Sequence, residues 1–308
     1  MNMAWLTDIH LNFIDKSARQ NFYQEIINTQ CDSVLISGDI AEAPSLTDIL
    51  NEMADYIKKP IYFILGNHDY YRGQIEEVRD TLTALTKTNG QLFWLPASGI
   101  QKLNNNTILL GQDGWADGRL GDYQNSRVVL NDSRMIADLF QEKILGKYQL
   151  LKKMQQLADV DAMKLQDDLK QAVGQNSKKI IVLTHVPPFK EACLHKGQIS
   201  GDDWLPYFSS KIIGDVLIVV AQQNPEIEFL VLCGHTHNEA HYQPLKNLTV
   251  LVGRSDYGNP SIQGLTPFCF FSQTMAGFAK KSITQNINRE LLCSQVEERH
   301  FQKQKWSW

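Results

Sequence analysis

The sequence predicts an α/β fold built around a largely parallel β-sheet. From Met1 to about Gly111, apolar runs of about five residues alternate with longer amphipathic segments, which is the strand and helix pattern of βα units. The runs are rich in Val, Ile and Leu and end at Gly, Pro or polar residues, which is typical of strands buried on both faces. Strand and helix signals resume from Lys178 to Gly253. With 308 residues, 43% of them hydrophobic, the chain suits one large domain or one domain with a substantial insertion.

Five strands and four helices are expected in the regularly alternating parts. Each strand is a short apolar run that stops at a polar residue. The expected strands are Met3–Thr7, Val34–Ser37, Ile61–Leu65, Ile180–Thr184 and Phe229–Leu232. The helices are longer segments with apolar residues at helical spacing. The expected helices are Lys16–Thr29, Ser45–Lys58, Gly73–Asn89 and Ser209–Gln223.

The pattern changes between about residues 128 and 175. This segment is rich in charge, its acids and bases are equal in number, and its apolar residues recur at helical spacing, as at Leu150, Met154 and Leu157. We expect a helical insertion that packs on the main domain through an amphipathic face. A cap over the active site or a partner-binding helix is the alternative.

The last part of the chain matches neither a strand nor a helix pattern. Residues 264–308 combine many aromatic residues with a basic excess, so they could dock on the core, pair with another subunit or touch an anionic surface. We therefore expect a main domain over residues 1–263 and a C-terminal extension over residues 264–308.

Composition argues against several function classes. The formal charge of -4 gives no global attraction to nucleic acid or to an anionic membrane. No apolar stretch approaches the roughly 20 residues that span a bilayer, and no signal-type segment is evident, so no membrane partner is expected. The five cysteines are an odd number without a CxxC pair, which favours reduced thiols and a cytoplasmic location.

Metal-seeking side chains follow all five apolar runs. They are Asp8 and His10, Asp39, Asn67 with His68 and Asp69, His185, and finally His235 and His237. Because ligand sites of open α/β sheets lie outside the carboxyl ends of the strands, we expect these side chains to meet at one rim of a sheet. The histidines His195, His241 and His300 fit no such pattern and are expected at the surface, although His241 is close enough to the last motif to line the pocket.

The residue types and their spacing favour a centre with two metal ions. Asp8 and His10 are two residues apart, as are His235 and His237, so each pair can serve two neighbouring ions. Asp39 has two carboxylate oxygens and is the natural bridge, while Asn67 and His185 bring the total to seven ligands. With two carboxylates against four metal charges, such a centre keeps about two positive charges and suits a phosphate group.

A proton donor is also available in the third motif. His68 is adjacent to a ligand and would be free to protonate the leaving oxygen. Such an acid needs an orienting partner, and Glu42 or Asp69 could supply it. His68, Glu42 and Asp69 are therefore the candidate catalytic residues.

Complete and in order, these motifs resemble the signature of the calcineurin-like metallophosphoesterase family, which reads DxH, GD, GNH[DE], H and GHxH. Here they are Asp8-Ile9-His10, Gly38-Asp39, Gly66-Asn67-His68-Asp69, His185 and Gly234-His235-Thr236-His237. The resemblance spans about Met1 to Gly258. It implies an α/β fold, a four-layer α/β/β/α sandwich with two mixed central sheets, to which this chain adds the helical insertion and the C-terminal segment.

The resemblance also implies how the residues share the ions. One ion would be held by Asp8, His10, Asp39 and His237, and the other by Asp39, Asn67, His185 and His235. His68 would be the acid. Mixed nitrogen and oxygen ligands accept Mn, Fe, Zn or Co, with metal availability deciding among them.

The expected function is hydrolysis of a phosphate ester by attack of a metal-bridging hydroxide. Protein Ser/Thr phosphatases of this family continue the GD motif with a Val-Asp-Arg-Gly type segment, whereas this chain has Ile40-Ala41-Glu42-Ala43. A small or nucleotide-like phosphodiester or monoester is therefore the expected substrate.

Two other functions compete with this hypothesis. A metal-dependent nuclease acting on DNA or RNA would need a basic track, which Arg119, Arg127 and Arg134 could form if folding brought them together. A non-catalytic scaffold of the same fold is disfavoured, because no ligand and no acid is missing.

Overall fold

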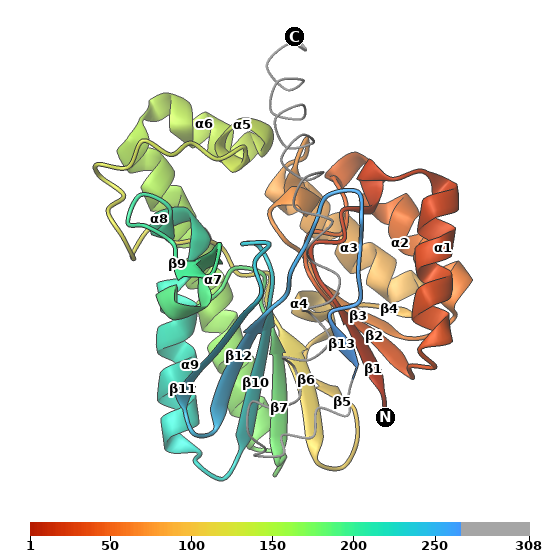
Figure 1. Ribbon diagram of the computed structural model, residues 1–308. Helices are drawn as coiled ribbons and strands as arrows, with labels where there is room; N and C mark the ends of the chain where they lie inside the picture. The colour runs from red at the N-terminus through yellow and green to blue at the C-terminus, as the bar shows by residue number, and fades with distance from the viewer. Residues whose placement is uncertain (266–308) are drawn as a thin grey trace. The chain divides into compact units, whose positions relative to one another are not determined.

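The structure is a computed structural model that describes residues 1–265, and its main elements are two β-sheets with helices packed against them (Figure 1). The first sheet has the order β13 (Gly264–Leu265), β1 (Met3–Leu6), β2 (Ser33–Ser37), β3 (Ile61–Ile64) and β4 (Leu92–Trp94). Strands β1 to β4 are parallel to one another, and β13 is antiparallel to β1.

The second sheet is also mixed. Its order is β11 (Ala240–Leu245), β12 (Leu248–Val252), β10 (Glu228–Cys233), β7 (Lys179–Leu183), β6 (Thr107–Gly111) and β5 (Gln101–Lys102). The four inner strands are parallel, and the edge strands β11 and β5 are antiparallel to their neighbours. A separate pair is formed by β8 (Leu194–His195) and β9 (Gln198–Ile199). The expected α/β class with two mixed sheets is confirmed.

The helices lie in the expected places. The α-helices of the described residues are α1 (Lys16–Asn28), α2 (Ala43–Ile57), α3 (Ile75–Thr88), α4 (Leu95–Ser98), α5 (Asp132–Met135), α6 (Ala137–Leu145), α7 (Lys147–Val173), α8 (Leu205–Phe208) and α9 (Lys211–Gln223). Short 3₁₀ turns are η1 (Leu11–Phe13), η2 (His68–Tyr70) and η3 (Lys190–Ala192). Every strand and helix expected from the sequence is present, and none of their ends is shifted by more than two residues. None of the helices within residues 1–265 has both the length and the apolar composition of a bilayer-spanning segment.

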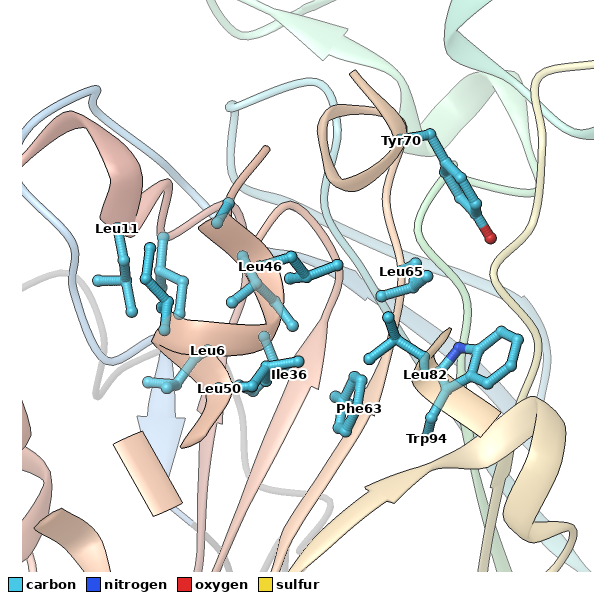
Figure 2. Close-up of a cluster of buried hydrophobic side chains, with 14 of the residues drawn as sticks. Leu6, Leu11, Ile36, Leu46, Leu50, Phe63, Leu65, Tyr70, Leu82 and Trp94 are labelled. Atoms are coloured by element: carbon cyan, nitrogen blue, oxygen red, sulfur yellow. The ribbon is translucent and has the colours of Figure 1, made fainter. Parts of the chain in front are cut away.

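Two hydrophobic cores hold the helices to the sheets. In the first core, Leu6, Ile36 and Phe63 from β1, β2 and β3 pack with Leu46 and Leu50 from α2, as Figure 2 shows. All five side chains are fully buried. Figure 1 shows α1, α2 and α3 beside the first sheet, and α7 and α9 beside the second.

The second core joins the insertion to the second sheet. Leu165 and Leu169 of α7 are buried with Ile180 and Val182 of β7 and with Leu217 of α9. The segment around residues 128–175 is therefore helical, as expected, and α7 packs through one face on the second sheet.

Strand residues that alternate with these core residues are buried as well. Trp5, Leu35 and Ile64 of the first sheet are at most 4% exposed, as are Leu109 and Ile181 of the second. Successive strand residues point to opposite faces, so both faces of these strands are covered. This agrees with the expectation of strands buried on both faces.

The first sheet extends beyond the expected end of the main domain. Strand β13 pairs with β1 through Ala4 and Leu265, which adds an edge strand two residues past the expected boundary at residue 263. The rest of the C-terminal extension lies outside the described residues, as do His300, Cys269 and Cys293. The cysteines within the described part, Cys31, Cys193 and Cys233, are buried free thiols.

A buried carboxylate joins the two sheets behind their carboxyl ends. Asp113, two residues beyond β6, accepts hydrogen bonds from the Leu65 backbone at 2.8 Å and from Trp94 Nε1 at 3.0 Å. It also accepts one from the Tyr70 hydroxyl at 2.6 Å. Leu65, Tyr70 and Trp94 belong to the half of the chain that builds the first sheet, so this one side chain fixes the two sheets against each other.

The same carboxylate connects to the insertion through an arginine. Arg79 of α3 lies 3.3 Å from Asp113 and 3.1 Å from Asp161 of α7. The Asp161 side chain is 1% exposed and also accepts a hydrogen bond from the Gly114 backbone. Burial raises the pKa of Asp161, although the charge of Arg79 opposes this rise. The insertion is therefore anchored by a buried ion pair as well as by apolar packing.

Removal of Arg79 tests this anchor. Arg79→Met leaves two buried carboxylates without their cation, which should lower the free energy of unfolding by about 3–5 kcal/mol at neutral pH. Lys211→Met is the control, because it removes an exposed ion pair with Asp215 and should cost less than about 1 kcal/mol. Urea unfolding followed by circular dichroism measures both. Equal losses in the two variants would contradict the anchoring role.

Candidate metal centre

The seven predicted ligands lie just beyond the carboxyl ends of five strands. Asp8 and His10 follow β1, Asp39 follows β2, Asn67 follows β3, His185 follows β7, and His235 and His237 follow β10. The expectation of one rim of one sheet is wrong, because β7 and β10 belong to the second sheet. The ligands come together because the carboxyl ends of both sheets meet.

Five of these residues have left-handed backbone conformations. The φ angles are 47° for Asp8, 41° for His10, 54° for Asp39, 73° for His235 and 55° for His237. Such a conformation costs a non-glycine residue roughly 1–2 kcal/mol. It turns the chain sharply at the end of a strand, so that side chains two residues apart reach the same place.

Backbone hydrogen bonds hold the turns after β1 and β2 together. The Asp8 nitrogen donates to the Gly38 carbonyl at 3.0 Å, and the His10 nitrogen donates to the Asp39 carbonyl at 3.0 Å. Gly38 itself has a φ of +94°, which a side chain rarely allows. At Gly66, a Cβ would collide with the Asp39 carboxylate, so glycine is required for the close approach of β2 and β3.

Four of the ligands form one compact group. Metal-binding atoms of Asp8, His10, Asp39 and His237 all lie within 4.8 Å of one another. His10 Nε2 is 3.2 Å from His237 Nε2, and His237 Nε2 is 3.3 Å from Asp8 Oδ1. This is the set that the family resemblance implies for the first ion.

The other ligands form a second group around Asn67. Its Oδ1 lies 3.0 Å from His185 Nε2 and 2.9 Å from His235 Nδ1. Asp39 Oδ1 is 3.4 Å from His185 Nε2, while Asp39 Oδ2 is 3.8 Å from His10 Nε2. The two oxygens of Asp39 therefore face different groups.

Both groups fit the dimensions of a metal site. Ligand atoms about 2.1 Å from one ion lie roughly 3–4 Å from each other. The neighbouring pairs fit this range, from 2.9 Å between Asn67 Oδ1 and His235 Nδ1 to 3.8 Å between Asp39 Oδ2 and His10 Nε2. The donors are imidazole nitrogens, carboxylate oxygens and an amide oxygen, which suit divalent transition metals. The residues present therefore fit two divalent ions, with Asp39 between them.

The charges in the centre depend on burial and on close pairing. Burial alone would raise the pKa of Asp8, but the hydrogen bond and charge of His237 lower it to about 2. Burial likewise opposes the ionisation of Asp39, yet the charge of His185 lowers its pKa well below the ordinary value. Both carboxylates are therefore ionised at neutral pH and offer two negative charges to cations.

The pKa values of the buried imidazoles shift in opposite directions. Burial lowers the pKa of His10 to about 3, so its ring is neutral and has a lone pair for a metal. Burial also lowers the pKa of His235, and the charge of His185 adds to this effect. In His185 burial is outweighed by the charge of Asp39, which raises the pKa to about 10. A protonated His185 therefore supplies positive charge between Asp39 and Asn67, where a bound cation would otherwise supply it.

The amide of Asn67 is oriented by a residue of the insertion. Asn67 Nδ2 donates to Asp132 Oδ1 at 2.8 Å, and the same oxygen accepts a hydrogen bond from the Tyr71 hydroxyl at 2.7 Å. With its nitrogen held by Asp132, Asn67 turns its oxygen towards His185 and His235. Asp132 begins α5, so the insertion contributes to the site in addition to packing on the second sheet.

Asp132 and Tyr71 were not predicted from the sequence. No periodicity or motif marks Asp132 among the many acids of the insertion. Tyr71 is two residues beyond the GNHD motif, which is the one signal that could have pointed to it. A cavity of about 30 Å³ is lined by Asn67 and Asp132 and by apolar residues of the insertion such as Leu139 and Met154.

His68 lies among aromatic rings beside the first group of ligands. Its ring stacks on Tyr71 with centroids 4.2 Å apart and packs edge to face with His10 at 4.6 Å. His68 Nε2 is 3.5 Å from the Tyr257 hydroxyl and 4.0 Å from Asp39 Oδ2. The His68 side chain is 15% exposed, so it lies at the border between the ligands and solvent.

Glu42 and Asp69 have partners other than His68. Glu42 pairs with Arg72 at 2.7 Å. Asp69 accepts hydrogen bonds from the backbone nitrogens of Ile40, Ala41 and Gly66. Within residues 1–265, no hydrogen bond or ion pair joins either carboxylate to His68. Asp69 instead holds the turns after β2 and β3 together, and His68 contacts the rings of Tyr71, Tyr257 and His10.

The remaining histidines of the described part lie at the surface. His195 on β8 and His241 on β11 are exposed, so the prediction that both lie at the surface is confirmed. His241 does not contact the ligands. Among the arginines of the nuclease hypothesis, Arg119 is paired with Asp117 at 3.0 Å and with Asp159 at 2.7 Å. Its charge is therefore compensated within the chain.

Known proteins share this sequence pattern and this fold. The sequence model of the calcineurin-like phosphoesterase family matches residues 1–239. A dimetal phosphatase from Danio rerio aligns with a TM-score of 0.53 at 12% identity, over 82% of this chain and 87% of that one. The phosphopantetheinyl hydrolase from Mycobacterium tuberculosis aligns with a TM-score of 0.56 at 10% identity, over 83% and 89%. Comparison with curated proteins found no sequence match.

At 12% and 10% identity, the likeness to these two structures is evidence for a shared fold alone. The family match is stronger evidence, because it covers more than half of the chain and includes all seven residues that converge on the centre. The chain therefore belongs to the calcineurin-like phosphoesterase family and is a hydrolase that acts on phosphoester bonds.

Proposed function

We propose that this protein uses two divalent metal ions to hydrolyse small organic phosphate esters, and that His68 protonates the leaving oxygen. The observation that carries the proposal is the convergence of seven ligands from two sheets into two groups that share Asp39. Mn, Fe, Zn and Co all suit these donors, and manganese is the first ion to test.

The residues divide the work between binding and proton transfer. Two bound ions would lower the pKa of a water towards neutrality and hold two phosphoryl oxygens. Asp39 would set the spacing of the two positions, since its oxygens face both groups. Asp132 would keep the oxygen of Asn67 directed into the second group. His68 would hold the proton that the leaving oxygen needs.

The surroundings of His68 support its role as the acid. It is next to the ligand Asn67 in the chain, and its Nε2 is 4.0 Å from Asp39. Stacking on Tyr71 fixes the ring plane. Because it is partly exposed, its proton can be replaced from solvent after each turnover.

An ester panel tests the proposed function. Metal-replete protein should hydrolyse p-nitrophenyl phosphate, bis-p-nitrophenyl phosphate or a cyclic nucleotide, and should lose at least about 10³-fold in kcat/KM when Asp39→Asn removes the shared carboxylate. His241→Ala on β11 is the control and should keep full activity. Single-stranded DNA is included in the panel, and preferred cleavage of DNA would favour the nuclease alternative. Full activity in Asp39→Asn would contradict the shared role of Asp39.

Leaving groups of graded pKa test His68. His68→Ala should bind metal normally but slow hydrolysis by about 10²–10⁴-fold for esters with poor leaving groups, because the departing oxygen then lacks a proton. Esters whose leaving group needs no proton should be affected much less. The measurement is kcat across a series of phenyl phosphates. A uniform loss across the series would show that His68 does not act as the general acid.

Metal titration tests the positioning role of Asp132. Asp132→Ala frees the Asn67 amide to rotate, and we expect metal affinity at the second group to fall about 10–100-fold. Asp167→Ala removes an exposed acid of α7 and is the matched control. Titration calorimetry with manganese on metal-free protein measures both affinities. Wild-type affinity in Asp132→Ala, with the fold intact, would rule out this role.

A further inference from the structure

We infer that Phe13 and Tyr257 form an aromatic platform that binds an aromatic ring in the leaving group of the ester. The inference rests on the proposed function, because it assigns a substrate class to the same site. The two residues come from distant parts of the chain, since Phe13 ends η1 and Tyr257 follows β12. Their rings meet edge to face, with centroids 5.5 Å apart and an interplanar angle of 87°.

The platform lies directly against the first group of ligands. The Tyr257 ring is 4.5 Å from the His10 ring and 4.9 Å from the His237 ring. The Phe13 ring is 5.9 Å from that of His10. A molecule bound at the first group of ligands would therefore have these two rings close by.

Both residues keep a large exposed surface. Phe13 is 50% exposed and Tyr257 is 54% exposed. Large aromatic side chains tend to be buried, and exposed apolar surface beside a polar site often marks a binding surface. Tyr257 lies against His10 and His237, Phe13 lies against His10, and about half of the surface of each residue is left exposed.

The position of His68 identifies which part of the substrate lies here. The proposed acid must be within hydrogen-bond reach of the leaving oxygen. The Tyr257 hydroxyl is 3.5 Å from His68 Nε2, and the two ring centroids are 6.1 Å apart. The group attached to the leaving oxygen is one bond further away, so it extends towards Tyr257 and Phe13 rather than into the cluster of ligands.

The chemistry of the platform favours an aromatic leaving group. Aromatic rings bind one another through offset or edge-to-face contacts, which the arrangement of Phe13 and Tyr257 leaves available. Stacking on one aromatic side chain changes affinity roughly 5- to 150-fold when that side chain is replaced. An aryl phosphate and a nucleoside phosphate share this chemistry, and they differ in the distance between the ring and the ester oxygen.

Selectivity between esters provides the kinetic test. Two substrates are compared, phenyl phosphate and a fluoroalkyl phosphate whose leaving group has the same pKa. The ratio of their kcat/KM values should fall roughly 5- to 150-fold in Phe13→Leu and in Tyr257→Leu, mainly through a higher KM for phenyl phosphate. Tyr257→Phe keeps the ring and should keep the ratio, which separates stacking from any effect of the hydroxyl on His68. Phe140→Leu, at a ring of α6 that is 46% exposed, should change nothing.

A nucleoside monophosphate distinguishes the two sources of the ring. If the platform variants impair phenyl phosphate, the platform binds a ring attached to the ester oxygen. If these variants impair hydrolysis of the nucleotide alone, the platform binds a base that the ribose separates from the ester oxygen. The proposal would be overturned if, in both Leu variants, the kcat/KM of phenyl phosphate and that of the nucleotide, each relative to the fluoroalkyl phosphate, were unchanged.

A binding measurement separates this inference from the proposed function. Calorimetry on metal-replete protein should show tighter binding of benzylphosphonate, in which a methylene group replaces the ester oxygen of phenyl phosphate, than of an alkylphosphonate, and Phe13→Leu should abolish the difference. If no ester is hydrolysed but this preference is present, the platform stands and the proposed function fails. If esters are hydrolysed but no preference exists, the platform fails and the proposed function stands.

Discussion

The contact between the two sheets is the constraint on which the candidate site depends. Four of its seven ligands follow strands of the first sheet and three follow strands of the second, so a small shift between the sheets would separate the two halves of the centre. Asp113 restrains that shift, because its carboxylate accepts hydrogen bonds from Leu65, Tyr70 and Trp94 across the contact. Arg79 connects this carboxylate to Asp161, so the insertion is part of the same restraint.

The centre itself is strained and highly charged, which explains why it needs such support. Five ligands adopt left-handed backbone conformations, each unfavourable for a residue with a side chain. Two ionised carboxylates, Asp8 and Asp39, are almost completely buried. Hydrogen bonds between the turns and pairing with His185 and His237 compensate for part of this cost. Bound cations would neutralise the remaining negative charge, so the strain is consistent with a site shaped for metal.

The strands, the helices and the seven ligands could largely be predicted from the sequence. Strands buried on both faces produce clear apolar runs, and each run ends in a chemically distinctive residue. The partition into two sheets could not be derived from those runs, since a parallel strand reads the same in either sheet; the family resemblance implied it. Asp132 was also beyond prediction, because its role depends on where α5 lies rather than on any local pattern. The roles considered for Glu42 and Asp69 followed from proximity in sequence, whereas Arg72 and three backbone nitrogens contact these carboxylates.

The proposed function requires two metal ions in the contact between the sheets, with Asp39 shared between them. The most direct measurement is anomalous X-ray scattering from a crystal grown with manganese. Two peaks about 3.5–4 Å apart are expected. One should lie among Asp8, His10 and His237, and the other among Asn67, His185 and His235. A single peak, or peaks outside these groups, would contradict the proposed function.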